Sequence, residues 1–146
     1  MLKQQRLRLP PLLETPGARW LAALAWMGLI FFFSSQSQLP QPNDPLLNFV
    51  LRKLAHFTVF GVLAFLLWRA LPRGRLVYAW SWTLTALYAV SDEYHQSFVA
   101  LRQPAARDVI IDACGAATAL LIVWYISRRE AQKSAGGVRG GPAARP

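Results

Sequence analysis

The stretch LAHFTVFGVLAFLLWRAL, residues 54–71, is almost continuously apolar and decides the fold class of this chain. A hydrocarbon core about 30 Å thick requires about 20 helical residues, and this stretch comes close to that length. Three further apolar stretches occur along the chain, at residues 20–33, 76–90 and 109–126. The first reaches spanning length if its helix covers residues 18–36, and the third if its helix continues to Asp92. We therefore predict an all-α integral membrane four-helix bundle with four spans.

The composition is that of one small membrane domain. The chain has 146 residues, 54% of them hydrophobic, and a positive mean hydropathy of +0.26. This length suits a single domain. The alternative is a soluble helical bundle, because core helices of soluble proteins have about the length of the two shorter stretches.

The chain divides into three expected segments. They are a basic cytoplasmic N-terminal segment (residues 1–18), a four-span membrane domain (residues 19–128) and a disordered cytoplasmic tail (residues 129–146). The tail is rich in Ala, Gly, Arg and Pro, which is typical of disorder. No small-x-small cleavage site follows the first apolar stretch, so we expect it to remain as an anchor. Asp44 is suited to cap a helix with Pro45 at its first position, which predicts one helix from Pro45 into the second span.

The basic residues predict the orientation in the membrane. If the four stretches cross the bilayer alternately, 12 of the 16 lysines and arginines lie on the side of the two termini. The positive-inside rule then places both termini in the cytoplasm. This topology accounts for the net charge of +9, so no nucleic-acid partner is expected. The single Cys114 excludes an internal disulfide.

Polar and ionisable side chains gather where the four stretches meet the opposite, outer side of the membrane. Lys53 and His56 are three residues apart, and Asp92 and Gln96 four apart, so each pair shares a helix face. Ionisable groups at membrane depth are costly, and a converging set indicates a functional site. We predict one outward-facing pocket formed by Ser35, Gln36, Lys53, His56, Asp92, Glu93, Gln96, Arg102, Arg107, Asp108 and Asp112.

Four motifs follow one another in a recognisable order. They are Ser34-Ser35-Gln36-Ser37, Lys53-x-x-His56, Asp92-Glu93-x-x-Gln96-x-Phe98 and Arg107-Asp108-x-x-x-Asp112-x-x-Gly115. Over about residues 20–126 this order resembles the VanZ-like family of small bacterial membrane proteins. The sequence departs from the form expected of that family at Phe60, where members often have Tyr, and at Asp112, where they often have Asn. The resemblance implies a multi-pass protein of the bacterial inner membrane, with a link to envelope stress or glycopeptide resistance.

Three classes of function fit the predicted pocket. The first is recognition of an anionic envelope ligand, a lipid phosphate or a cell-wall precursor, by Lys53, Arg102 and Arg107. The second is an enzyme that uses His56 as a general base or a site where carboxylates and histidines bind a metal, although no HExxH, CxxC or Ser-His-Asp arrangement is present. The third is a structural subunit that packs through the small residues near Cys114. We favour the first, with membrane lipids and an envelope precursor as partners, and assign no catalytic residue, cofactor or metal. The oligomeric state is left open.

Overall fold

A computed structural model describes residues 15–37, 43–100, 102 and 105–138. Four helices form it: α1 (Pro16–Ser34), α2 (Pro45–Ala70), α3 (Val77–Gln96) and α4 (Ala106–Val138). The described residues contain no strand, so the predicted all-α class is confirmed. Three of the helices, α1, α2 and α4, are long and apolar enough to cross a membrane. Within the described residues α3 does not qualify, because serines and threonines along it and two carboxylates near its end lower its hydropathy.

Two helix starts follow from local capping chemistry. The Thr15 side chain accepts a hydrogen bond from the Ala18 amide at 3.2 Å, and Pro16 follows it. Likewise the Asp44 carboxylate accepts from the Leu47 amide at 2.9 Å. A proline at the first helical position has no amide hydrogen to leave unsatisfied. The predicted single helix from Pro45 into the second apolar stretch is therefore confirmed.

The end of α4 differs from the predicted start of the tail. The helix runs through Val138, beyond residue 129 where the disordered tail was expected to begin. Residues 128–133 read Arg-Arg-Glu-Ala-Gln-Lys, and these residue types all have high helix propensity. They extend the helix past its apolar part. The rest of the tail, residues 139–146, and the N-terminal residues 1–14 lie outside the described residues.

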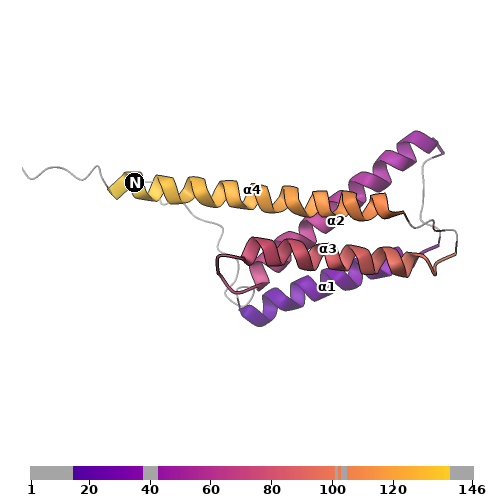
Figure 1. Ribbon diagram of the computed structural model, residues 1–146, viewed down its shortest axis with the longest axis horizontal. Helices are drawn as coiled ribbons and strands as arrows, with labels where there is room; N and C mark the ends of the chain where they lie inside the picture. The colour runs from indigo at the N-terminus through magenta and orange to yellow at the C-terminus, as the bar shows by residue number, and fades with distance from the viewer. Residues whose placement is uncertain (1–14, 38–42, 101, 103–104, 139–146) are drawn as a thin grey trace, which may run out of the picture.

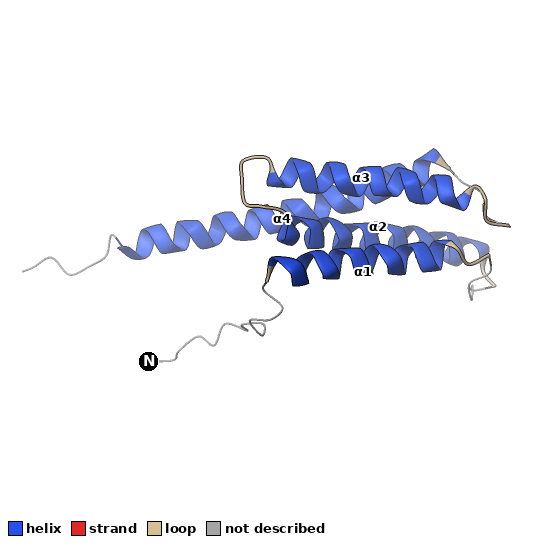
Figure 2. Ribbon diagram, turned by 90° about the horizontal axis from the view of Figure 1, so that it is seen from below, coloured by secondary structure: helices blue, strands red, loops and turns tan. Residues whose placement is uncertain are grey.

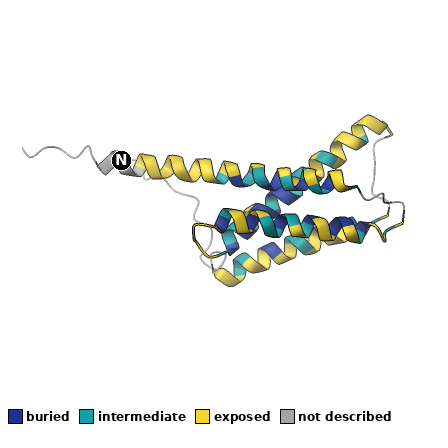
Figure 3. Cartoon of the chain, viewed as in Figure 1, coloured by how far each residue is buried: buried dark blue, intermediate teal, exposed yellow. Residues whose placement is uncertain are grey.

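The helices lie side by side, and α2 contacts each of the other three (Figures 1 and 2). The core forms around one face of α2, where Phe60, Leu63 and Leu67 are buried against Ala23 of α1 and Ala89 of α3. Large apolar side chains also cover the outward faces of the helices, which Figure 3 shows as mostly exposed. An apolar exterior of this kind is typical of helices that contact lipid.

The two longest helices approach each other closely at Gly115. A β-carbon built on Gly115 would lie 2.1 Å from the backbone oxygen of Phe57 in α2. Opposite it, Gly61 faces the backbone oxygen of Gly115, 3.2 Å from where its own β-carbon would lie. Small residues allow such backbone contact between membrane helices. The small-residue segment near Cys114 thus packs inside the molecule at Gly115 and Ala116, while Cys114 itself is exposed.

Candidate ligand-binding site

Polar side chains from all four helices meet at one end of the molecule. There α1 and α3 end, while α2 and α4 begin or have passed their first turns. Each helix brings its polar groups to this end because the chain reverses direction between consecutive helices. The groups form three connected arrangements and border one cleft.

Two acid–base pairs join α2 to α4. Lys53 Nζ lies 2.5 Å from Asp108 Oδ1, and His56 Nδ1 lies 3.2 Å from Asp112 Oδ1. The bases are three residues apart and the acids four, so both pairs form along one line of contact. Both carboxylates are buried, and Asp112 is only 1% exposed. Buried charges require such partners, and these pairs hold the two helices in register.

A hydrogen-bonded network joins α1 to α3. Asp92 Oδ2 accepts a hydrogen bond from Ser34 Oγ at 2.8 Å and another from Gln96 Nε2 at 2.9 Å. The prediction named Ser35, but the buried hydroxyl in this network belongs to Ser34. Ser35 instead donates to the Phe31 carbonyl and lies 3.0 Å from His95 Nε2.

The segment between α3 and α4 is anchored by two side chains. The Arg102 guanidinium donates to the Gln36 carbonyl at 3.1 and 3.2 Å and to the Phe33 carbonyl at 3.2 Å. These carbonyls lie at the end of α1, where the last helical turn leaves acceptors without intrahelical partners. Glu93 Oε1 accepts a hydrogen bond from the Ala105 amide just before α4 begins. Gln36 thus takes part through its backbone, while its side chain donates to the Phe32 carbonyl.

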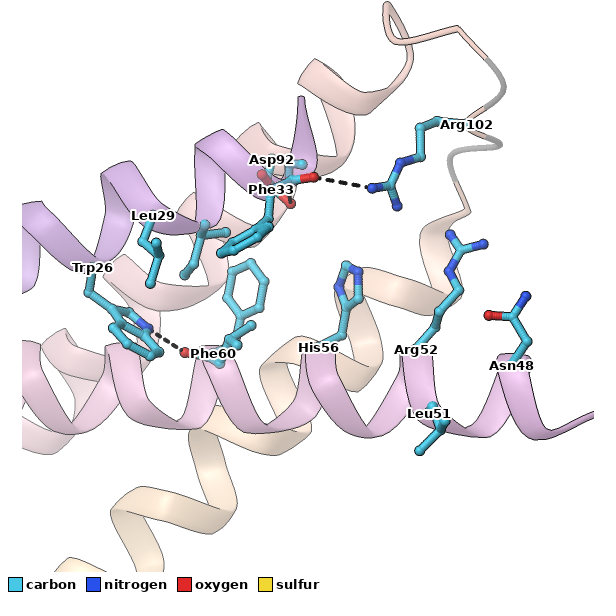
Figure 4. Close-up of a pocket in the computed structure, with 13 residues that line it drawn as sticks. Trp26, Leu29, Phe33, Asn48, Leu51, Arg52, His56, Phe60, Asp92 and Arg102 are labelled. Carbon is cyan, nitrogen blue, oxygen red and sulfur yellow. Dashed lines mark hydrogen bonds between the residues drawn. The ribbon is translucent and has the colours of Figure 1, made fainter. Parts of the chain in front are cut away.

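A cleft of about 480 Å³ opens between α1 and α2 at this end of the molecule (Figure 4). Its walls are mainly apolar, and its polar groups gather toward the end where α2 begins. It is lined by Trp26, Leu29, Ile30, Phe33, Ser34, Asn48, Leu51, Arg52, His56, Val59, Phe60, Asp92 and Arg102. A cavity of this size with few polar groups is typical of small-molecule sites.

Arg52 is a residue of this cleft that the sequence prediction missed. It lies four residues before His56, so both point from the same face of α2 into the cleft. The same four-residue spacing relates Asn48 to Arg52, and this repeat was the available signal. Arg52 also borders a second, more polar hollow of about 350 Å³, together with Lys53 and Arg107.

Arg52 and Arg102 act on each other electrostatically. Burial lowers the pKa of the Arg102 guanidinium from its ordinary value, and the positive charge of Arg52 lowers it further. An arginine remains protonated at neutral pH despite such a shift. Two guanidiniums near one cleft therefore create a region that favours an anion.

The eleven predicted residues separate into groups with different surroundings. His56, Asp92 and Arg102 line the cleft, whereas Lys53, Arg107 and Asp108 border the second hollow. Glu93, Gln96 and Asp112 are buried in the contacts described above. Within the described ranges, no group of three His, Cys, Asp or Glu side chains is placed to hold a metal ion.

Helices with the length and apolar character of membrane spans, joined by buried polar contacts at one end, define a multi-pass membrane protein. The profile of the VanZ/LLP1 family matches residues 19–127, and the chain belongs to this family. No curated protein matches the chain, and no solved structure does.

Proposed function

We propose that this protein binds a membrane amphiphile that carries a phosphate, such as a lipid or a lipid-linked cell-wall precursor. The observation that carries the proposal is the position of Arg52 and Arg102 at the polar end of an otherwise apolar cleft. A phosphate would be held by the paired N–H groups of Arg52 and by the N–H groups of Arg102 that do not donate to the carbonyls at the end of α1. Its hydrocarbon chain would follow the apolar walls formed by residues such as Trp26 and Phe33.

The proposed location is the bacterial inner membrane, with four spans and both termini in the cytoplasm. The distribution of lysine and arginine supports this orientation. The placement of α3 alongside α1 and α4 supports its role as the fourth span, despite its lower hydropathy. In this orientation the cleft opens near the outer leaflet, where envelope precursors are assembled into the wall. A link to glycopeptide resistance would act through that ligand.

Binding is favoured over catalysis by the hydrogen bonds around His56. Asp112 contacts Nδ1 of His56 and would orient the ring, as the acid does in a catalytic dyad. However, the serine that lines the cleft, Ser34, donates its hydroxyl to Asp92 instead of His56. The arrangement therefore provides an oriented histidine without an activated nucleophile beside it. His56 is better suited to donate a hydrogen bond to an anionic ligand.

The test is native mass spectrometry of the full-length protein with added lipids of matched chain length. We expect phosphatidylglycerol to bind and uncharged diacylglycerol to bind at least tenfold more weakly. Arg52→Gln and Arg102→Gln should each weaken phosphatidylglycerol binding about tenfold, since each removes a charge-assisted hydrogen bond of about 1.5–3 kcal/mol. Arg75→Gln removes an exposed arginine from the turn at the other end and should change nothing.

Three results would contradict the proposal. Equal binding of phosphatidylglycerol and diacylglycerol would show that phosphate is not recognised. Equal losses in the Arg75→Gln control and the two cleft variants would show that lipid is attracted by overall charge. Displacement of the lipid by an equal concentration of inorganic phosphate would exclude a role for the hydrocarbon chain.

A further inference from the structure

One oxygen of Asp92 is buried at the cleft without a hydrogen-bond partner. Asp92 is 4% exposed and lines the cleft, and its Oδ2 already accepts from Ser34 and Gln96. No hydrogen bond from any described residue reaches Oδ1. A buried carboxyl oxygen without a partner is costly, which indicates that another group meets it when the site is in use.

The charges around Asp92 indicate the character of that group. Two bases on α2 are paired with other acids, because Lys53 contacts Asp108 and His56 contacts Asp112. The Arg102 guanidinium donates to the carbonyls at the end of α1. Arg52 lines the same cleft. Among the described residues, neither it nor any other base forms a salt bridge with Asp92. A ligand that places an ammonium beside Oδ1 would supply both the missing donor and the missing positive charge.

The cleft thus presents two kinds of polar contact to one ligand. Arg52 and Arg102 can only donate hydrogen bonds, and they suit the acceptor oxygens of a phosphate. Asp92 Oδ1 suits a donor, and Figure 4 shows Asp92 and Arg102 near Phe33 at the same end of the cleft. Asp92 acts electrostatically on Arg102, where its negative charge opposes the lowering of the pKa by burial and Arg52. The acceptor and donor positions therefore border one cleft.

We propose that the cleft selects a phospholipid whose headgroup combines a phosphate with a primary ammonium, as in phosphoethanolamine. The phosphate meets Arg52 and Arg102, and the ammonium donates to Asp92 Oδ1. This inference rests on the proposed function for the phosphate contact. It adds the recognition of the amine, which requires Asp92 and not the arginines.

Three phospholipids with identical acyl chains separate the amine contact from the phosphate contact. Phosphatidylethanolamine has a phosphate and an ammonium with N–H donors. Phosphatidylcholine has a phosphate and a positive charge without N–H donors, and phosphatidylmethanol has the phosphate alone. In native mass spectrometry of the full-length protein, we expect phosphatidylethanolamine to bind about tenfold more tightly than the other two.

Asp92→Asn should remove the preference, so that phosphatidylethanolamine and phosphatidylmethanol bind the variant within about twofold of each other. The matched control is Glu130→Gln, which neutralises a carboxylate near the far end of α4 and should keep the preference. Equal binding of the three lipids to the wild-type protein would overturn the inference and show that only water meets Oδ1. That result would leave the proposed function standing, because phosphate recognition depends on the arginines. A preference that persists in Asp92→Asn would also overturn it. The wild-type comparison decides the question even if the variant does not fold.

Discussion

At the scale of single residues, acidic and basic side chains differ in burial at the end of the molecule that holds the cleft. Asp92, Glu93, Asp108 and Asp112 are all buried, whereas Arg52 and Arg107 are exposed. Asp108 and Asp112 each pair with a base, and Glu93 accepts a hydrogen bond from a backbone amide. Asp92 has neither kind of partner. A ligand that approaches this end therefore meets mainly cations, although the sequence places slightly more acids than bases there.

The pair formed by Lys53 and Asp108 leads to a prediction about stability. Lys53→Met should lower the free energy of unfolding in detergent by about 2 kcal/mol, because it leaves a buried carboxylate without its cation. The cost stays below that of a fully buried pair since the Lys53 side chain retains 17% exposure. Thermal and denaturant unfolding would measure the change, and Arg75→Met, at an exposed position, provides the control.

A double-mutant cycle tests whether the two residues act as a pair. Lys53→Met combined with Asp108→Leu should be less destabilising than the sum of the single changes, because the double variant leaves no unpaired charge. Additive effects would mean that Lys53 is solvated and contributes nothing through Asp108.

The two positions where the chain departs from the expected family pattern fit their surroundings. Phe60 is fully buried and lies near the rings of His56 and Tyr88, with centroids 6.3 and 6.2 Å apart. A hydroxyl there would need a partner in an apolar wall. Asp112 contacts His56, so a carboxylate at this position can accept a hydrogen bond from the imidazole ring.

At the scale of helices, the contact between α2 and α4 depends on Gly115. Phe57, whose carbonyl faces Gly115, is adjacent to His56, and Gly115 lies three residues after Asp112. The close approach of the two backbones therefore lies beside the acid–base pairs. If the helices were forced apart, His56 and Asp112 would separate as well.

Gly115→Ala should destabilise the protein by about 1–3 kcal/mol, the usual cost of overpacking. The added methyl would overlap the backbone of α2, which cannot move aside as a flexible side chain can. Gly28→Ala in α1 is the matched control, because nothing lies within 4 Å of its β-carbon position and alanine favours the helix. Similar unfolding temperatures for the two variants would contradict the close contact.

The extent of each helix could be predicted only where local chemistry marks it. Asp44 with Pro45 identified the start of α2, because capping depends on neighbours in the sequence. The end of α4 could not be placed from the loss of apolar residues, because helix propensity continues through Lys133 while hydrophobicity falls.

At the scale of the whole molecule, the proposed topology turns on whether α3 crosses the membrane. Single cysteines at Asn43, Gly74 and Ala100, in a Cys114→Ala background, lie before α2, before α3 and after α3. We expect an impermeant thiol reagent to label Asn43→Cys and Ala100→Cys in intact cells, but not Gly74→Cys, because the positive-inside rule predicts a cytoplasmic location for the basic turn around Gly74.

Labelling at Asn43→Cys without labelling at Ala100→Cys would show that α3 does not span and would place the C-terminus outside. Labelling at Gly74→Cys alone would reverse the whole orientation. After membrane permeabilisation all three positions should react, which controls for buried or hindered thiols.

The sequence by itself determined the helical class, the membrane character and the end of the molecule where the polar residues gather. These follow from hydropathy and helical spacing, which are properties of neighbouring residues along one helix. The sequence also predicted that Lys53 and His56 share one face of a helix, because residues three apart lie on the same side of an α-helix.

Only the tertiary structure decided which of the polar residues partner one another and which border the cleft. Spacing alone did not distinguish Ser34 from Ser35, because the choice depends on how α1 is rotated against α3. The position of Arg52 also depends on how the helices pack. Arg52 and His56 share a face of α2, and this face lines the cleft only because α1 forms the opposite wall. The relative rotation and separation of helices arise from packing between distant segments, such as the contact of Gly115 with Phe57, and no local pattern encodes them.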